Sequence, residues 1–84
     1  LIEFTLEDKI QAKKILARIL SPAQLSKLKL VKGENLEQNG EPCFGWANST
    51  NLRELIIAVD SRLRSKALEG VLLHEAVHIK NYDH

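Results

Sequence analysis

The chain has 84 residues, 44% of them hydrophobic, and its 12 Lys and Arg nearly balance its 11 Asp and Glu. This length predicts one small domain whose core lies near the lower limit for unaided folding. No block of basic residues points to nucleic acid, and no apolar run approaches the ~20 residues of a membrane-spanning helix. We therefore expect neither a nucleic-acid partner nor a membrane partner.

The sequence contains a single cysteine, Cys43, and no methionine. One cysteine cannot form an internal disulfide and fits a reducing compartment, so we expect a cytoplasmic protein. Cys43 has no Cys or His neighbour at the spacing of metal ligands and is expected to be a small strand residue. The absence of an initiating methionine indicates a processed or truncated version of a longer chain, with a domain that is incomplete at its C-terminus.

The N-terminal third predicts a short strand or ordered lead-in and two helices. Residues 1–4 alternate apolar and polar, and Thr5 can cap a helix over residues 6–20. Ser21-Pro22 ends this helix and can start a short one over residues 22–27. The core stripe of the first helix should consist of Ala12, Ile15, Leu16 and Ile19, widened by Leu6, Ile10 and Leu20.

Three strands are predicted between these helices and the last one. Asn39-Gly40 is the strongest hairpin signal in the sequence, and residues 48–51 predict a further turn. Phe44 and Trp46 share a face of the second strand and are expected in the core. The third strand carries five consecutive apolar residues, so it should be covered on both faces and central in its sheet. The expected strands are residues 27–32, 43–47 and 54–59.

The last helix is predicted from about Arg62 to Tyr82, with Asp60 or Ser61 as its cap. Its residues are apolar almost all round, so the helix should be buried. Gly70 lies in its interior, where glycine costs ~1 kcal/mol relative to alanine. This glycine either packs closely against a neighbouring element or leaves clearance beside a bound metal ion.

Within this helix, residues 74–78 read H-E-x-x-H, the zinc peptidase signature. Positions four apart lie on one face of an α-helix, so the imidazoles of His74 and His78 can converge on one zinc ion. Glu75 lies roughly 100° further round the helix, close enough to reach a water on the metal but too far to share its first coordination shell. It can therefore act as general base while that water attacks a carbonyl carbon.

A catalytic zinc ion takes three protein ligands, and His84 is the only further histidine. The spacing H-E-x-x-H-x-x-x-x-x-H resembles the metzincin motif, in which a glycine ends the helix so that the last histidine turns back to the metal. Asn81 stands in the place of that glycine, and asparagine tolerates the left-handed conformation. On an unbroken helix His84 would point roughly 120° away from the midline of the pair and could not ligate the same ion.

A second resemblance covers about the first three quarters of a minimal catalytic domain. The α/β lead-in, the apolar strand ending near Asp60 and the run of residues 71–83 are similar to the gluzincin peptidases, in particular the minigluzincins and their HtpX-like and CAAX-prenyl endopeptidase relatives. This resemblance implies zinc ligation by His74 and His78, with Glu75 as the base. The family's third ligand, a glutamate on a following helix, has no counterpart here.

The expected fold is α+β: a minimal zincin-like catalytic domain over residues 1–84, with an N-terminal helix and a small three-stranded sheet packed on the buried metal-binding helix. The expected function is zinc-dependent hydrolysis of peptide bonds. A peptide or unfolded protein would add as a strand to an exposed sheet edge along the cleft. The alternatives are a zinc-binding module without turnover, whose site is incomplete, and a metzincin-like peptidase that uses His84.

Overall fold

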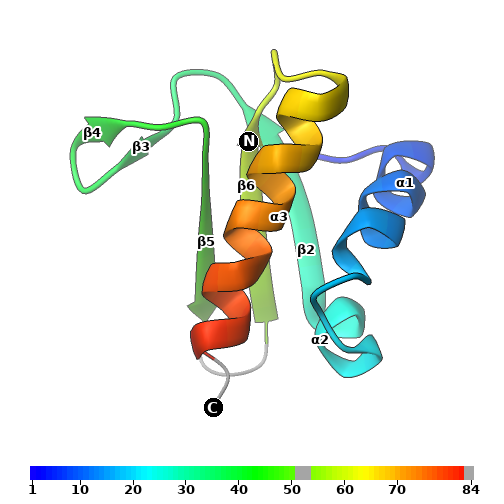
Figure 1. Ribbon diagram of the computed structural model, residues 1–84. Helices are drawn as coiled ribbons and strands as arrows, with labels where there is room; N and C mark the ends of the chain where they lie inside the picture. Colours follow the sequence, from blue (N-terminus) through cyan, green and yellow to red (C-terminus); the bar gives the residue numbers. More distant parts are fainter. Residues whose placement is uncertain (51–53, 83–84) are drawn as a thin grey trace.

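The structure is a computed structural model that describes residues 1–50 and 54–82. The described helices are α1 (Leu6–Leu16), α2 (Pro22–Lys27) and α3 (Ser65–Tyr82). The described strands are β1 (Ile2–Glu3), β2 (Leu28–Gly33), β3 (Glu37–Gln38), β4 (Glu41–Pro42), β5 (Gly45–Thr50) and β6 (Glu54–Asp60). They form a four-stranded sheet in the order β1-β2-β6-β5 and a separate hairpin of β3 and β4 (Figure 1). The predicted α+β class is confirmed, but the main sheet has four strands rather than three.

The central strand of the sheet is β6, which runs parallel to β2 and antiparallel to β5. Its side chains alternate between two faces, as expected for a strand. Leu55, Ile57 and Val59 join the main core with residues of the helices, while Ile56 and Ala58 join a smaller apolar cluster on the opposite face. The prediction of a central strand covered on both faces is therefore confirmed.

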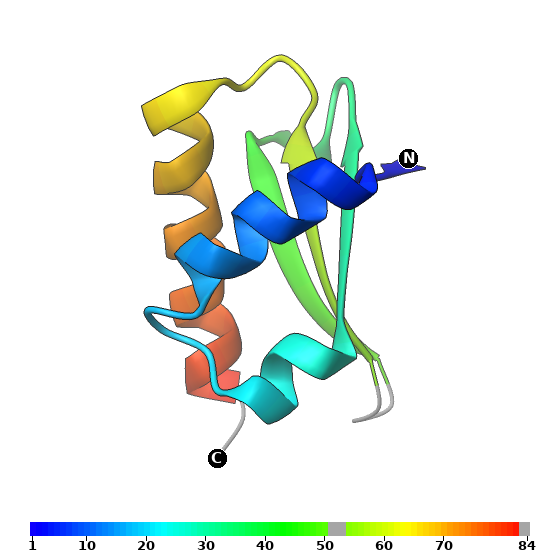
Figure 2. The ribbon, with the colours of Figure 1, turned by 90° about the vertical axis from the view of Figure 1, so that its right-hand side faces the viewer.

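The three helices form a layer against one face of the sheet (Figure 2). In this layer α3 packs against β5 and β6, and α1 packs against α3. On the other face, Leu36 and the half-buried Cys43 cover Val31 and Ala58. Among the described residues, no helix is long and apolar enough to cross a membrane.

The first helix is shorter than predicted, because α1 ends at Leu16 rather than near Leu20. Its predicted cap is present, since the Thr5 hydroxyl accepts a hydrogen bond from the Asp8 N–H at 3.2 Å. The N–H groups of Arg18 and Ile19 bond to carbonyls three residues back, whereas that of Leu20 bonds to the Leu16 carbonyl four residues back. Leu20, four residues after the buried Leu16, lies in the core and is 3% exposed.

Two residues expected to widen the core stripe of α1 lie at the surface instead. Leu6 is 74% exposed and Ile10 is 49% exposed. They are four positions apart and therefore share one helix face, which is turned away from the sheet. The buried residues of α1 are Ala12 and Leu16.

The start and cap of the last helix were also predicted wrongly. α3 begins at Ser65, and neither Asp60 nor Ser61 caps it. The Asp60 carboxylate instead accepts hydrogen bonds from the Arg62 backbone N–H (2.8 Å), Nε (3.0 Å) and Nη2 (2.7 Å). These bonds lower the pKa of Asp60 to about 2. Because its oxygens are bonded to Arg62, they do not reach the first turn of the helix.

The turn predicted over residues 48–51 is wrong for the part that the structure describes. Residues 48–50 continue β5, because the antiparallel pairing with β6 extends to Thr50 opposite Glu54. Asn51 lies outside the described residues. Polar composition therefore gave a false turn signal in a paired strand.

The core aromatic pair predicted for β5 is not formed. Phe44 precedes the strand and is 67% exposed, whereas Trp46 is half-buried in the smaller apolar cluster. The carbonyl of Phe44 accepts a hydrogen bond from the Asp60 N–H at 2.8 Å, so its backbone is held while its ring is not covered. Cys43, expected in a strand, lies between β4 and β5.

Two local predictions are confirmed. Asn39 (φ 55°) and Gly40 (φ 81°) form the turn between β3 and β4, with the positive φ values that a tight hairpin requires. In β2, Leu28 and Leu30 are buried and Lys29 is exposed, as predicted for a half-buried strand, but Val31 on the opposite face is also buried, in the smaller apolar cluster.

Candidate functional site

The site helix α3 has one buried face, and the two histidines lie on the exposed one. Val77, beside them, is 45% exposed. The expectation of a helix buried all round is therefore wrong, because the sheet and α1 cover only one side of it. The fully buried residues of α3 are Leu72, Ala76 and Ile79.

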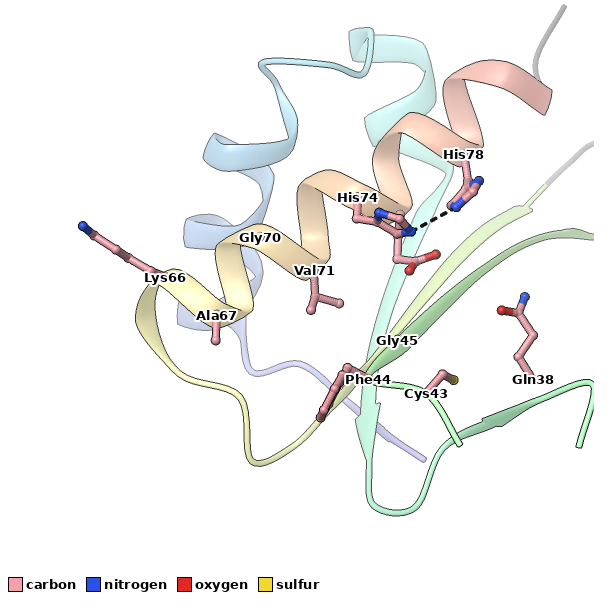
Figure 3. A pocket seen from close by; sticks show the side chains of 11 residues that line it. Gln38, Cys43, Phe44, Gly45, Lys66, Ala67, Gly70, Val71, His74 and His78 are labelled. Atoms are coloured by element: carbon pink, nitrogen blue, oxygen red, sulfur yellow. Dashed lines mark hydrogen bonds between the residues drawn. The ribbon is translucent and has the colours of Figure 1, made fainter. Parts of the chain in front are cut away.

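The structure brings the side chains of His74 and His78 together (Figure 3). Their Nε2 atoms are 3.2 Å apart, and their rings are 4.8 Å apart between centroids at an interplanar angle of 77°. Two nitrogens bound to one tetrahedral zinc ion at about 2.0–2.1 Å would lie about 3.3 Å apart. In this structure the contact is within hydrogen-bond distance, with the donor set by the tautomers of the two rings. Because the two separations are similar, both nitrogens could ligate one ion without a change in the helix backbone.

Glu75 differs from the histidines in being buried, with 7% of its surface exposed. Burial raises the pKa of its carboxyl group, and the nearby imidazoles of His74 and His78 act in the opposite direction. It is thus a desolvated carboxylate beside the imidazole pair, and desolvation makes it a better proton acceptor than an exposed one.

The described residues do not provide a complete metal-ligand set. Within residues 1–50 and 54–82, no three His, Cys, Asp or Glu side chains are grouped so that they could hold a metal ion. Glu75 consequently does not act as a third ligand beside the pair. His84, the predicted third histidine, lies outside the described residues.

A cleft of about 660 Å³ runs along the exposed side of α3 and contains all three of these side chains. One wall is α3 itself. The other wall is formed by the hairpin and by the residues that lead into β5, including Gln38 and Phe44 (Figure 3). The histidine pair and the carboxylate therefore face a space that a substrate could enter.

The spacing between the two walls depends on Gly45, which the motif reading did not single out. A Cβ atom on Gly45 would lie 2.6 Å from Cγ1 of Val71 and 2.9 Å from the carbonyl oxygen of Ala58. Only glycine lets β5 lie this close to α3. The sequence did contain a signal for this close contact, because a glycine inside a predicted strand can mark the point where another element approaches.

Gly70, for which the sequence left two interpretations, has no packing role. A Cβ atom there would meet no atom within 4 Å, so close packing against a neighbour is wrong. Gly70 lines the cleft one turn before His74. The other interpretation, clearance beside a bound metal ion, stays a prediction.

Comparisons of the chain with models of protein families, with curated proteins and with solved structures found no match. The class that the fold and the site define is an α+β domain in which one helix presents an imidazole pair and a buried carboxylate to a cleft.

Proposed function

We propose that this protein is a zinc-dependent peptidase with a minimal zincin-like fold, which hydrolyses peptide bonds with Glu75 as its general base. The supporting observation is the 3.2 Å separation of the His74 and His78 Nε2 atoms, which suits two ligands of a tetrahedral ion. When bound, zinc supplies Lewis acidity and a water of lowered pKa. His74 and His78 would hold it, with His84 as a candidate third ligand.

In this mechanism Glu75 carries the proton. Its carboxylate accepts a proton as water attacks the carbonyl carbon of the substrate, and it then donates that proton to the amine that leaves. Burial favours this role, because a desolvated carboxylate takes up a proton more readily than an exposed one. A base of this kind contributes about 10²-fold to 10⁴-fold in rate.

Substrate binding would use the edge of the sheet. In the described sheet, β5 is an edge strand with β6 as its partner, and its first residue, Gly45, lines the cleft. An extended peptide can pair with such an edge through backbone hydrogen bonds, which brings its carbonyl groups alongside α3. We propose peptides or unfolded proteins as substrates and, from the cysteine content, the cytoplasm as the location.

Zinc content tests the ligands. His74→Ala and His78→Ala should each lose zinc on dialysis, as measured by mass spectrometry of the metal, because each removes one nitrogen of the pair. Both positions are exposed, so the fold should survive. Lys80→Ala, exposed on the same helix, is the control that keeps zinc. If both histidine variants kept one zinc per chain, the ligand assignment would be wrong.

Glu75→Gln tests the base, since it retains the size of the side chain and removes its basicity. It should keep zinc and lose cleavage of an unfolded protein such as casein by about 10²-fold to 10⁴-fold. Loss of zinc together with activity would instead make Glu75 a metal ligand.

A second candidate function is a zinc-binding module without turnover, which the lack of a three-ligand group among the described residues favours. X-ray absorption of the zinc-loaded protein separates the two. An enzyme keeps an oxygen ligand from exchangeable water, whereas a closed site shows protein ligands only. Loss of both zinc and cleavage in His84→Ala would support the metzincin-like alternative.

A further inference from the structure

The molecule has a second cavity, of about 380 Å³, between α1, the start of α3 and one end of the sheet. β2 and β6 run parallel, so their C-terminal ends meet there, with the register partners Lys32 and Val59 on the cavity wall (Figure 1). The C-terminal ends of parallel strands are a common place for bound ligands in α/β sheets. α3 turns one face to this cavity and another to the cleft with the histidine pair, and among the described residues none lines both.

The floor of this second cavity is apolar and belongs to the main core. Phe4, Ala12, Val59 and Leu72 line it, and the most exposed of them, Phe4, is only 6% exposed. The space therefore reaches down to core side chains instead of running along the surface. An apolar group that entered it would contact these side chains and be removed from water, which is favourable.

Charged side chains line the same cavity on its solvent side, and cations exceed free anions there. Lys32, Arg64 and Asp8 are exposed or half-exposed. Asp60 also lines the cavity, but its carboxylate is bonded to Arg62, so that pair is neutral as a whole. Two cations are thus opposed by the single carboxylate of Asp8.

Both cations are placed to receive an anion. The Arg64 side chain is held at the cavity because its Nη1 donates hydrogen bonds to the carbonyls of Ser61 (2.7 Å) and Leu63 (2.9 Å). Lys32 Nζ lies 3.7 Å from the nearest oxygen of Asp8, and the two side chains are 34% and 55% exposed. A long and exposed ion pair of this kind contributes little, so Lys32 can contact a bound anion at small cost.

We propose that this second cavity binds a small amphipathic carboxylate of the medium-chain fatty acid class. The apolar tail would lie on the floor formed by Phe4, Ala12, Val59 and Leu72, and the carboxylate would contact Lys32 and Arg64. A volume of about 380 Å³ is near the lower end for ligand pockets, which suits a short tail better than a long-chain lipid. The site is separate from the histidine pair and does not depend on the proposed peptidase function.

Binding can be located by NMR titration of the ¹⁵N-labelled protein with octanoate. The amide signals of Ala12, Leu68 and Leu72, which line the second cavity, should shift saturably. Those of Gly45 and Gly70, which line the cleft, should stay in place. The titration is run with zinc and with a chelator, and the same signals should shift in both, because the histidine pair is not involved.

Three related compounds separate the roles of tail and charge. Acetate has the carboxylate without the tail and should bind at least about a hundredfold more weakly than octanoate. Octanol and octylammonium have the tail without the negative charge, and both should bind about tenfold more weakly or worse.

Lys32→Gln and Arg64→Gln should each weaken octanoate binding about threefold to tenfold and leave octanol binding unchanged. Both positions are partly or fully exposed, so the fold should survive. Lys29→Gln is the matched control. Lys29 lies on the same strand in a similar ion pair, 3.6 Å from Glu3, but does not line the cavity, so its loss should not change octanoate binding.

Four results would overturn the proposal. Octanoate could fail to bind saturably, or it could shift only the signals of Gly45 and Gly70, which would place it in the cleft. Octanol could bind as tightly as octanoate, or octylammonium could bind most tightly, which would make Asp8 the recognising group. A loss of octanoate binding that was the same in Lys29→Gln as in Lys32→Gln would exclude the assigned carboxylate contact.

Discussion

Gly45 and Gly70 lie on opposite walls of the cleft, the first in a crowded place and the second beside open space. Substitution by alanine should therefore change the free energy of unfolding in opposite directions. Gly45→Ala should lower the free energy of unfolding by about 1–3 kcal/mol, because its Cβ would clash with Val71 and with the Ala58 carbonyl. Gly70→Ala should raise it by up to about 1 kcal/mol, since its Cβ meets nothing. Urea denaturation measures both, and changes of the same sign would contradict this description of the cleft.

Asp60 should stabilise the protein in a pH-dependent way. Its pKa is about 2 in the folded protein, because it bonds to Arg62, and about 3.9 in an unfolded chain. A carboxyl group whose pKa falls on folding contributes stability above the unfolded value and loses it as pH drops through the folded value. The difference in unfolding free energy between the parent and Asp60→Asn should therefore be constant above about pH 5 and shrink between about pH 4 and pH 2. Urea titrations at pH 7, 4 and 2 test this, and a difference that grew in acid would refute it.

At the residue scale, sequence reasoning succeeded where the cause was local. The convergence of His74 and His78 follows from helix periodicity alone, and the structure has their Nε2 atoms 3.2 Å apart. The burial of Glu75, the exposure of Phe44 and the clash that excludes a side chain at Gly45 depend on elements far apart in the chain. No local pattern carries that information.

The short helix α2 should depend on its N-terminal cap. The Ser21 hydroxyl accepts a hydrogen bond from the Gln24 N–H at 3.2 Å, and the Gln24 side chain accepts one from the Ser21 N–H at 2.8 Å. Ser21→Ala removes the first bond and should cost about 0.5–2 kcal/mol of stability, measured by urea denaturation. Ser21→Asp, which retains an acceptor, is the control and should remain close to the parent.

At the element scale, the type of most helices and strands was predicted correctly, but the residues at which the helices α1 and α3 end or begin were not. α1 ends where the N–H groups of Arg18 and Ile19 bond to carbonyls three residues back, a change in bonding that the apolar spacing does not reveal. The start of α3 depends on the bonding of Asp60 to Arg62. The two-residue strands β3 and β4 exist only as a pair, so their one visible signal was the turn at Asn39-Gly40.

For the whole molecule, bound zinc should raise thermal stability, because a ligand that binds the folded chain shifts the unfolding equilibrium. At a free zinc concentration of 100 Kd the gain is about 2.7 kcal/mol, reduced by any binding to the unfolded chain. Melting curves with zinc and with a chelator measure it. His78→Ala should melt at the same temperature in both, and a zinc-dependent shift in that variant would contradict the assigned site.

The order of the sheet was beyond local patterns, because it depends on which distant strands meet. The sequence indicated that β6 is central, from its five apolar residues after Glu54. It did not indicate that β2 would be the parallel neighbour of β6, because the hairpin and β5 separate these two strands along the chain. Their joint burial against α3 and α1 decides the pairing.

This parallel pairing has a consequence for how the chain folds. The loop between β5 and β6 is short, because Thr50 pairs with Glu54. The chain segment between β2 and β6 is much longer, because Leu28 pairs with Leu55. Closing a longer loop costs more entropy, so we expect the β5–β6 pair to form early and β2 to join it late. A destabilising substitution at Ala47 in β5 should then slow folding, and one at Leu30 in β2 should mainly accelerate unfolding.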